Sequence, residues 1–126
     1  FGLTDSGRRR LFIATGTGIA PMLAMFAQAP DLENDTLLFG CRHQEEDLTA
    51  RISSPMPGTV VRCLSREEAP GSFHGRVTQA VTDLAHDLRL DPDSTDVYLC
   101  GSAAMVTDAQ RVLEHEGYTS VLTEPY

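Results

Sequence analysis

Short apolar runs alternate along the chain with longer segments whose apolar residues recur at helical spacing. Five runs predict buried strands, at residues 11–14, 36–39, 59–64, 97–100 and 119–122. Four further segments predict helices, at residues 20–28, 44–52, 76–89 and 103–116. Strand alternating with helix is typical of a parallel sheet that is covered by helices on both faces. The pattern therefore predicts an α/β fold with a doubly wound, Rossmann-like sheet of five parallel strands.

The size and composition of the chain fit one domain of this kind. It has 126 residues, of which 41% are hydrophobic and 22% are charged, as in a soluble globular protein. No apolar run approaches the ~18 residues of a membrane span, and no signal peptide is evident, so we expect a cytoplasmic location and no membrane association. The formal net charge of −8 argues against nucleic acid as a partner.

The residue types that the chain lacks exclude several kinds of chemistry. All ten basic residues are arginine, so no lysine is present for a Schiff base or for the phosphate contact of a P-loop. The three cysteines, Cys41, Cys63 and Cys100, form no C-x-x-C pair, and the four histidines show no ligand spacing. We therefore expect no metal site, and cysteines that remain reduced thiols.

The first predicted strand ends in a corner rich in glycine. It runs into Gly16-Thr17-Gly18, and Pro21 follows three residues later. Glycines let the backbone approach a ligand without an intervening Cβ, and proline suits the first turn of a helix. A helix that begins here offers N–H groups and the positive end of its dipole to a phosphate. A plain turn between strand and helix explains the same residues, so the corner alone leaves both interpretations open.

This corner differs from the usual dinucleotide pattern, which is G-x-G-x-x-G followed by an acid about twenty residues on. Pro21 takes the place of the third glycine. The second strand ends in Gly-Cys-Arg-His at residues 40–43, with no carboxylate for a ribose 2′-hydroxyl. The common NAD fingerprint is therefore absent.

A second glycine follows the fourth predicted strand, in "VYLCGSAAM" at residues 97–105. We expect Cys100 to point out at the end of this strand, although a cysteine in such a position is commonly a small buried residue. No Asp or His stands at fixed spacing to activate its thiol, and Ser102 is not in the G-x-S-x-G elbow of a hydrolase. A nucleophilic enzyme is therefore not indicated.

Four motifs follow the first four strands in order: "GTGIAP", "FGCR", "LSRE" and "YLCGSAAM". Their combination resembles the C-terminal, pyridine-nucleotide-binding half of the ferredoxin–NADP reductase family, over essentially the whole chain. The resemblance implies that residues 1–126 form an NAD(P)-binding domain. It also implies that a flavin-binding β-barrel precedes this domain, with Phe1-Gly2 as the remnant of the connection. Ser102 departs from the Pro or Asn that the family usually shows, which leaves the shape of that loop open.

The same resemblance implies roles for single residues. Those that would line the pyrophosphate and nicotinamide pocket are Thr15, Gly16, Thr17, Gly18 and Pro21. Cys100 and Gly101 would flank the nicotinamide, with Cys100 near the carbon that gives up hydride. Met105 would fix the loop after that strand. Near the end of the chain, Glu124 would lie close to the reaction centre and Tyr126 on or beside the flavin ring.

The choice between the two nicotinamide cofactors depends on the residues after the third strand. A 2′-phosphate carries about two negative charges and is recognised well by a hydroxyl and a planar guanidinium. Ser65 and Arg66 stand where NADP-dependent members of the family have this pair, but Glu67 and Glu68 follow directly and would repel phosphate. The residues therefore favour NADPH and leave NADH open. Further candidate contacts, each also explained as a solvated arginine near a helix start, are Arg42 and Arg76.

Two functions remain at this point. In the first, which the resemblance implies, hydride passes from NADPH or NADH to FAD or FMN on the other domain. Single electrons then pass to a ferredoxin, a flavodoxin or an oxygenase component. The basic run Arg8-Arg9-Arg10 would then either contact an acidic electron-transfer partner or form a solvated edge. In the second function, the corner at Gly16 binds some other phosphate, or none, in a module without a redox role.

Overall fold

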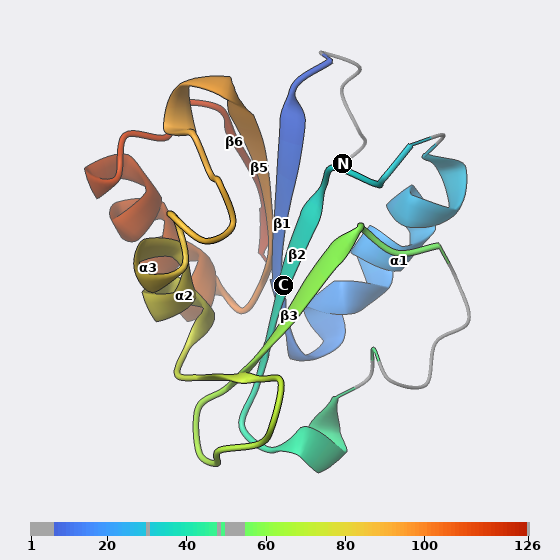
Figure 1. The fold of residues 1–126 in the computed structure, drawn as a ribbon, viewed down its shortest axis with the longest axis vertical. Coiled ribbons are helices and arrows are strands. Elements are labelled where there is room, and N and C mark those ends of the chain that lie inside the picture. Colours follow the sequence, from blue (N-terminus) through green and yellow to red (C-terminus); the bar gives the residue numbers. More distant parts are fainter. Residues whose placement is uncertain (1–6, 30, 48, 50–54, 126) are drawn as a thin grey trace.

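The computed structural model describes residues 7–29, 31–47, 49 and 55–125. Within them, six strands form one parallel sheet in the order β4-β3-β2-β1-β5-β6 (Figure 1). The strands are β1 (Arg9–Thr15), β2 (Thr36–Cys41), β3 (Thr59–Leu64), β4 (Phe73–His74), β5 (Thr95–Gly101) and β6 (Val121–Pro125). The predicted parallel α/β sheet is confirmed, with one strand more than the five expected.

The additional strand, β4, has only two residues. Phe73 and His74 pair with Cys63 and Leu64 at the carboxyl end of β3. So short a strand carries no hydrophobic period, and for that reason the sequence pattern did not predict it. The last strand, β6, begins at Val121, two residues later than expected.

Three α-helices and three short 3₁₀ turns connect the strands in the described residues. They are η1 (Gly16–Gly18), α1 (Ile19–Gln28), η2 (Gln44–Glu46), α2 (Val77–Asp83), η4 (Pro92–Ser94) and α3 (Ala103–His115). The predicted helix at 76–89 is shorter than expected, since α2 ends at Asp83 and hydrogen-bonded turns continue the segment to Leu90. None of the helices in this part of the chain has the length and apolar character of a membrane span.

The helix predicted at residues 44–52 is wrong in its described part. The turn η2 ends after Glu46, and Asp47 continues in an extended conformation. The buried Asp47 carboxylate accepts the N–H of Thr49 at 2.9 Å and pairs with Arg62 of β3 at 3.2 Å. A side chain held inward in this way fixes the chain against β3 directly after η2 ends.

Helices cover both faces of the sheet, α1 on one and α2 with α3 on the other (Figure 1). Side chains alternate along β1: Phe12 and Ala14 pack in the core beneath α1, while Leu11 and Ile13 pack in the core beneath α2 and α3. In the first core, the Phe12 ring lies 4.8 Å from the Phe26 ring and 5.2 Å from the Tyr98 ring, between centroids. Burial on both faces explains why the central strands are continuous apolar runs in the sequence.

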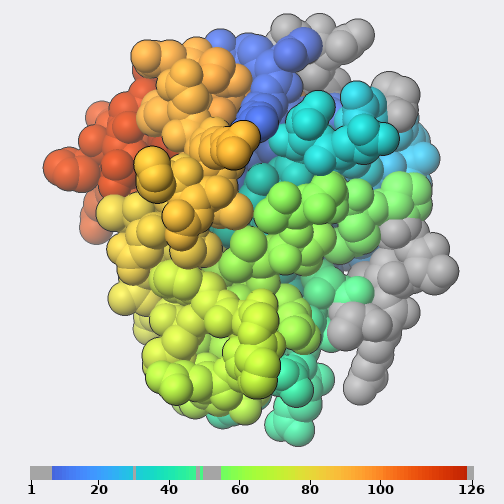
Figure 2. All heavy atoms as spheres, viewed as in Figure 1, coloured from blue at the N-terminus to red at the C-terminus, as the bar shows by residue number. Residues whose placement is uncertain are grey.

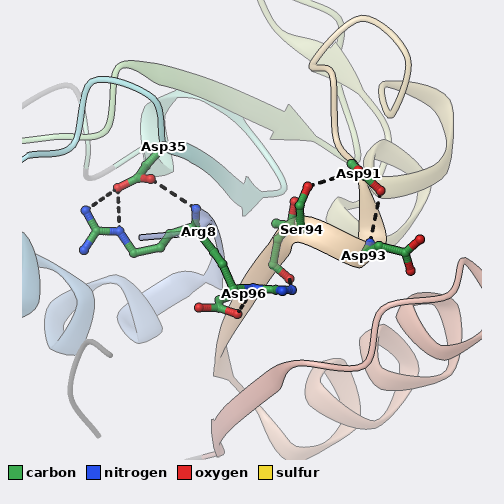
Figure 3. A network of polar contacts seen from close by, with 8 residues as sticks. Arg8, Asp35, Asp91, Asp93, Ser94 and Asp96 are labelled. Atoms are coloured by element: carbon green, nitrogen blue, oxygen red, sulfur yellow. Dashed lines mark hydrogen bonds and ion pairs between the residues drawn. The ribbon is translucent and has the colours of Figure 1, made fainter. Parts of the chain in front are cut away.

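The basic run Arg8-Arg9-Arg10, whose last two residues begin β1, is bonded within the molecule and is more than a solvated edge. The Arg8 guanidinium pairs with the buried Asp96 of β5 at 2.8 Å, and Arg10 pairs with the buried Asp35 at 2.7 Å (Figure 3). Arg9 donates to the carbonyl oxygen of Arg89 at 3.1 Å. These bonds join the amino end of β1 to both neighbouring strands, at the edge of the sheet opposite the glycine corners.

Candidate nucleotide-binding site

The two glycine corners predicted from the sequence meet at the carboxyl edge of the sheet. Strands β1 and β5 are neighbours, with Ala14 paired to Cys100. A Cβ at position 18 would lie 2.5 Å from the carbonyl oxygen of Cys100 and 2.8 Å from its carbonyl carbon. Glycine is required at this position because η1 packs directly on the backbone that ends β5.

Thr15 lies between two further glycines at the same edge. A Cβ at Gly40 of β2 would lie 3.0 Å from Thr15 Cγ2, and a Cβ at Gly101 of β5 would lie 2.7 Å from Thr15 Oγ1. A Cβ at Gly101 would also meet Met105 Cε, so Met105 of α3 covers this glycine. The role predicted for Met105, fixing the loop after β5, stays a prediction, and the structure places its side chain over Gly101.

The start of α1 offers fewer hydrogen-bond donors than the sequence predicted. The N–H of Ile19 is already bonded to the carbonyls of Gly16 and Thr17, and Pro21, the third residue of the helix, has no N–H. Gly16 has φ of 53° and, like Thr17, is exposed. An anion at this corner would therefore contact the backbone of η1 and the Thr17 hydroxyl more than the helix end itself.

Ser102 determines how α3 begins. Its Oγ accepts the N–H of Met105 at 3.2 Å, which is the bond of a serine N-cap. Its carbonyl accepts the N–H of Val106 at 2.9 Å. The loop shape that the sequence left open at this position is thus a capped helix start directly after Gly101.

Cys100 is buried and does not point outward as expected. Its residue is 1% exposed and packs in the core beneath α1. Burial, and secondarily the Glu124 carboxylate, raise the pKa of the Cys100 thiol above its ordinary value of 9.0. Glu124 of β6 pairs with Cys100 in the ladder and is exposed at this edge. The Cys100 thiol therefore remains protonated near neutral pH.

The other predicted residue of this region, Tyr126, lies outside the described residues.

The predicted 2′-phosphate residues lie at the other half of the same edge. Beyond the strands, the N–H of Ser65 bonds to the carbonyl of Cys41 at 3.1 Å and that of Arg66 to the carbonyl of Arg42 at 3.0 Å. The N–H of Gly75 bonds to the carbonyl of Leu64 at 2.8 Å, one residue before Arg76. Arg42, Ser65, Arg66 and Arg76 are thereby brought to one end of the molecule, where the loop after β3 lies beside η2 (Figure 2).

The arginines of this group differ in their partners. Arg42 pairs with Glu46 at 3.2 Å. Burial tends to raise the pKa of the Glu46 carboxyl, but hydrogen bonds from Arg42 and His43 outweigh it and hold that pKa below its ordinary value. Arg66 and Arg76 are both exposed, and neither forms an ion pair with another described residue. Two guanidinium groups are therefore available to an anion here.

An open depression of about 500 Å³ lies beside these residues, and no pattern in the sequence indicated it. It is lined by Glu68, Ala69, Pro70, Ser72 and His74. The Ser72 hydroxyl is buried and has no hydrogen-bond partner among the described residues. The depression forms because β4 pairs with β3 and folds the loop after β3 back toward the sheet, and the sequence did not predict β4.

No group of His, Cys, Asp and Glu side chains within the described residues is arranged to hold a metal ion. The arrangement is instead that of a nucleotide-binding α/β domain, with its site at the carboxyl edge of a parallel sheet. Residues 12–111 match the oxidoreductase NAD-binding domain family, and the chain belongs to that family. Membership in an oxidoreductase family argues against the second function considered from the sequence, a phosphate-binding module without a redox role.

Individual relatives agree with this assignment. The chain is 30% identical over 120 residues to a 1,2-phenylacetyl-CoA epoxidase subunit from Escherichia coli, covering 86% of this chain and 34% of that protein. It is 41% identical over 63 residues to component C of methane monooxygenase from Methylosinus trichosporium, covering 44% of this chain and 18% of that component. The chain thus spans about a third or less of the length of these relatives.

A solved structure shows the same fold. The ferredoxin NADP⁺ reductase of Neisseria gonorrhoeae, with bound FAD and NADP, matches with a TM-score of 0.78 at 22% identity. The match covers 94% of this chain and 56% of that one. At this level of identity the likeness concerns the fold alone.

Proposed function

We propose that this domain binds NADPH and orients its nicotinamide for hydride transfer to a flavin held by a separate β-barrel domain. The observation that carries the proposal is the contact of Gly18 with the Cys100 carbonyl, which joins the diphosphate corner to the end of β5. Thr15, between Gly40 and Gly101, lies where a ligand would cross from one corner to the other. Family membership supports a pyridine nucleotide as this ligand.

The residues present fit such a cofactor, and their contribution is orientation. A bound nicotinamide supplies a hydride, and a bound flavin accepts it. Gly16, Thr17 and Gly18 would hold the diphosphate, while Gly101, covered by Met105 and Thr15, would border the pocket of the nicotinamide ring. The buried, protonated Cys100 would bound the ring pocket without exchanging a proton. Holding two reacting groups at fixed separation is itself a large part of the acceleration in such reactions.

The preference for NADPH over NADH rests on the arginines after β3. Arg66 and Arg76 are exposed and without ion-pair partners in the described part of the chain, and Ser65 adds a hydroxyl. NADH lacks the 2′-phosphate, so these groups would have no anion to bind in its complex. Glu124 at the carboxyl end of β6, and Tyr126 beyond it, would border the flavin side of the nicotinamide.

The electron acceptor is proposed from the relatives. One relative is a component of a methane monooxygenase and the other is a subunit of an epoxidase, so both belong to multicomponent systems by their names. An oxygenase component is therefore a fitting acceptor. A ferredoxin or flavodoxin would serve the same one-electron role. The relatives are longer than this chain, in agreement with a flavin domain elsewhere in the complete protein.

Calorimetric titration with 2′-phospho-AMP and AMP tests the phosphate preference. Because a hydrogen bond to a charged group contributes about 1.5–3 kcal/mol, we expect 2′-phospho-AMP to bind at least about tenfold more tightly than AMP. Arg66→Ala should remove most of this difference. Arg111→Ala, which removes a positive charge from the exposed surface of α3, is the control and should retain it. Equal binding of both nucleotides to the unmodified protein would refute the NADPH preference.

A further inference from the structure

Glu67 follows Arg66 in the sequence, and its charge alone would repel a phosphate bound there. Its contacts suggest the opposite effect. We propose that Glu67 is a positioning residue that increases affinity for the 2′-phosphate, by holding together the three segments that present the arginines. This inference rests on the proposed function, since it concerns the same phosphate.

Glu67 makes one contact through its side chain and one through its backbone. Its carboxylate Oε1 accepts the N–H of Gln44, the first residue of η2. Its carbonyl oxygen lies 2.7 Å from Nδ1 of His74 in β4, which donates to it. We call this arrangement, formed by Gln44, Glu67 and His74, the Glu67 clip. It connects the segment after β2, the loop after β3, and β4.

Each segment of the Glu67 clip leads directly to an arginine of the proposed site. Gln44 lies two residues after Arg42, Glu67 lies next to Arg66, and His74 lies two residues before Arg76. The backbone bond from Arg66 N–H to the Arg42 carbonyl, 3.0 Å long, lies directly beside the clip. Loss of the Glu67 side chain would therefore release η2 from the loop and weaken the relative placement of Arg42 and Arg66.

The carboxylate of Glu67 is also poorly placed to repel an anion. A charge bonded to a backbone N–H at the start of a helical turn is partly compensated by the peptide dipoles of that turn. Glu68 differs, because it is exposed and lines the depression with no such bond among the described residues. Glu67 and Glu68 carry the same charge next to each other and differ in this contact, so Glu68 provides a matched control.

Calorimetric titration with 2′-phospho-AMP distinguishes positioning from repulsion by the sign of the effect. We expect Glu67→Ala to weaken binding roughly tenfold, as for the loss of one hydrogen bond to a charged group. Glu67→Gln retains an oxygen that accepts the Gln44 N–H and should restore binding to within roughly threefold of the unmodified protein. Glu68→Ala should leave binding unchanged or tighten it roughly twofold, since exposed charges interact weakly. Tighter binding by Glu67→Ala would overturn the proposal.

A spectroscopic readout separates this role from a general loss of structure. The backbone amide resonance of Gln44 should shift strongly in Glu67→Ala, much less in Glu67→Gln, and not at all in Glu68→Ala. The urea midpoints of the three variants should remain close together. If the unmodified protein binds AMP and 2′-phospho-AMP equally, the proposed phosphate site fails and this role fails with it. If the preference is present and Glu67→Ala retains it, the role of Glu67 alone is refuted.

Discussion

Gly18→Ala is the most direct perturbation of the contact on which the proposed site depends. The new Cβ would lie 2.5 Å from the Cys100 carbonyl oxygen, whereas ordinary contact begins at 3.4 Å. The corner and the end of β5 would therefore have to separate by about 0.9 Å. Strand β5 is fully buried and paired on both sides, to β1 and to β6. Almost all of this displacement must then come from η1.

The expected loss of stability follows from two opposing effects. Forcing one extra carbon into a packed site costs about 1–3 kcal/mol. Gly18 has a helical backbone (φ −61°, ψ −14°), which alanine also adopts, so the substitution recovers about 0.4–1 kcal/mol by restricting the unfolded chain. The free energy of unfolding should therefore fall by about 1–2 kcal/mol, measured by urea denaturation.

Nucleotide binding gives the second readout for the same variant. Displacement of η1 moves the diphosphate corner away from β5, so calorimetry should show at least about tenfold weaker binding of NADPH. Gly7→Ala is the control, since Gly7 has a positive φ of 72° but, apart from its chain neighbours, no atom of the described residues within 4 Å of the new Cβ. It should reduce stability and leave binding unchanged. A Gly18→Ala protein with unaltered midpoint and unaltered affinity would refute the geometry on which the site is built.

Two further predictions concern parts of the fold outside the site. Asp35→Ala would leave the Arg10 guanidinium, which is 14% exposed, without its carboxylate at 2.7 Å, and urea denaturation should show a loss of about 3 kcal/mol with NADPH binding unchanged. A loss below about 1 kcal/mol would contradict this structural role. Burial raises the pKa of the Cys63 thiol from 9.0 to about 12, so the folded thiol keeps its proton while the unfolded one ionises. Between pH 8 and 10 the free energy of unfolding should therefore fall by about 1.4 kcal/mol more in the unmodified protein than in Cys63→Ala, and equal slopes would contradict it.

The parts of the fold that the sequence predicted are those whose cause is local. Residues 11–14 are buried on both faces, and such burial requires a continuous apolar run that can be recognised without a structure. The helix expected at 44–52 was wrong because a long-range contact decides the structure there. Asp47 pairs with Arg62, which is 15 residues away on β3, and no local pattern reveals this pair. The same holds for β4, which exists only because β3 offers it two partners.

In the candidate site, too, some residues could be interpreted from the sequence and others could not. Glycine is informative because few other residues fit where two backbone segments approach closely. The corners at Gly18 and Gly101 were expected to border one pocket, and they lie side by side. Charged residues are less informative, because one charge can repel a ligand, bind it or hold the protein together. Glu67 was expected to oppose phosphate, but its carboxylate is bonded to Gln44. Only the fold distinguishes these roles.

Two arginines at the carboxyl edge of the sheet differ from two at the amino edge in how their charge is compensated, and this difference supports the placement of the site. At the amino edge, Arg8 and Arg10 are paired with the buried carboxylates of Asp96 and Asp35, so their charge is already compensated within the protein. A protein with a net charge of −8 has ample acid to compensate its other arginines in the same manner. At the carboxyl edge, Arg42 is paired with Glu46, but Arg66 and Arg76 have no ion pair in the described residues, and the neighbouring Glu67 carboxylate is bonded to a backbone amide. Positive charge that no carboxylate of the described residues compensates, at the same edge of the sheet as the glycine corners, is what the doubly charged 2′-phosphate of a dinucleotide requires.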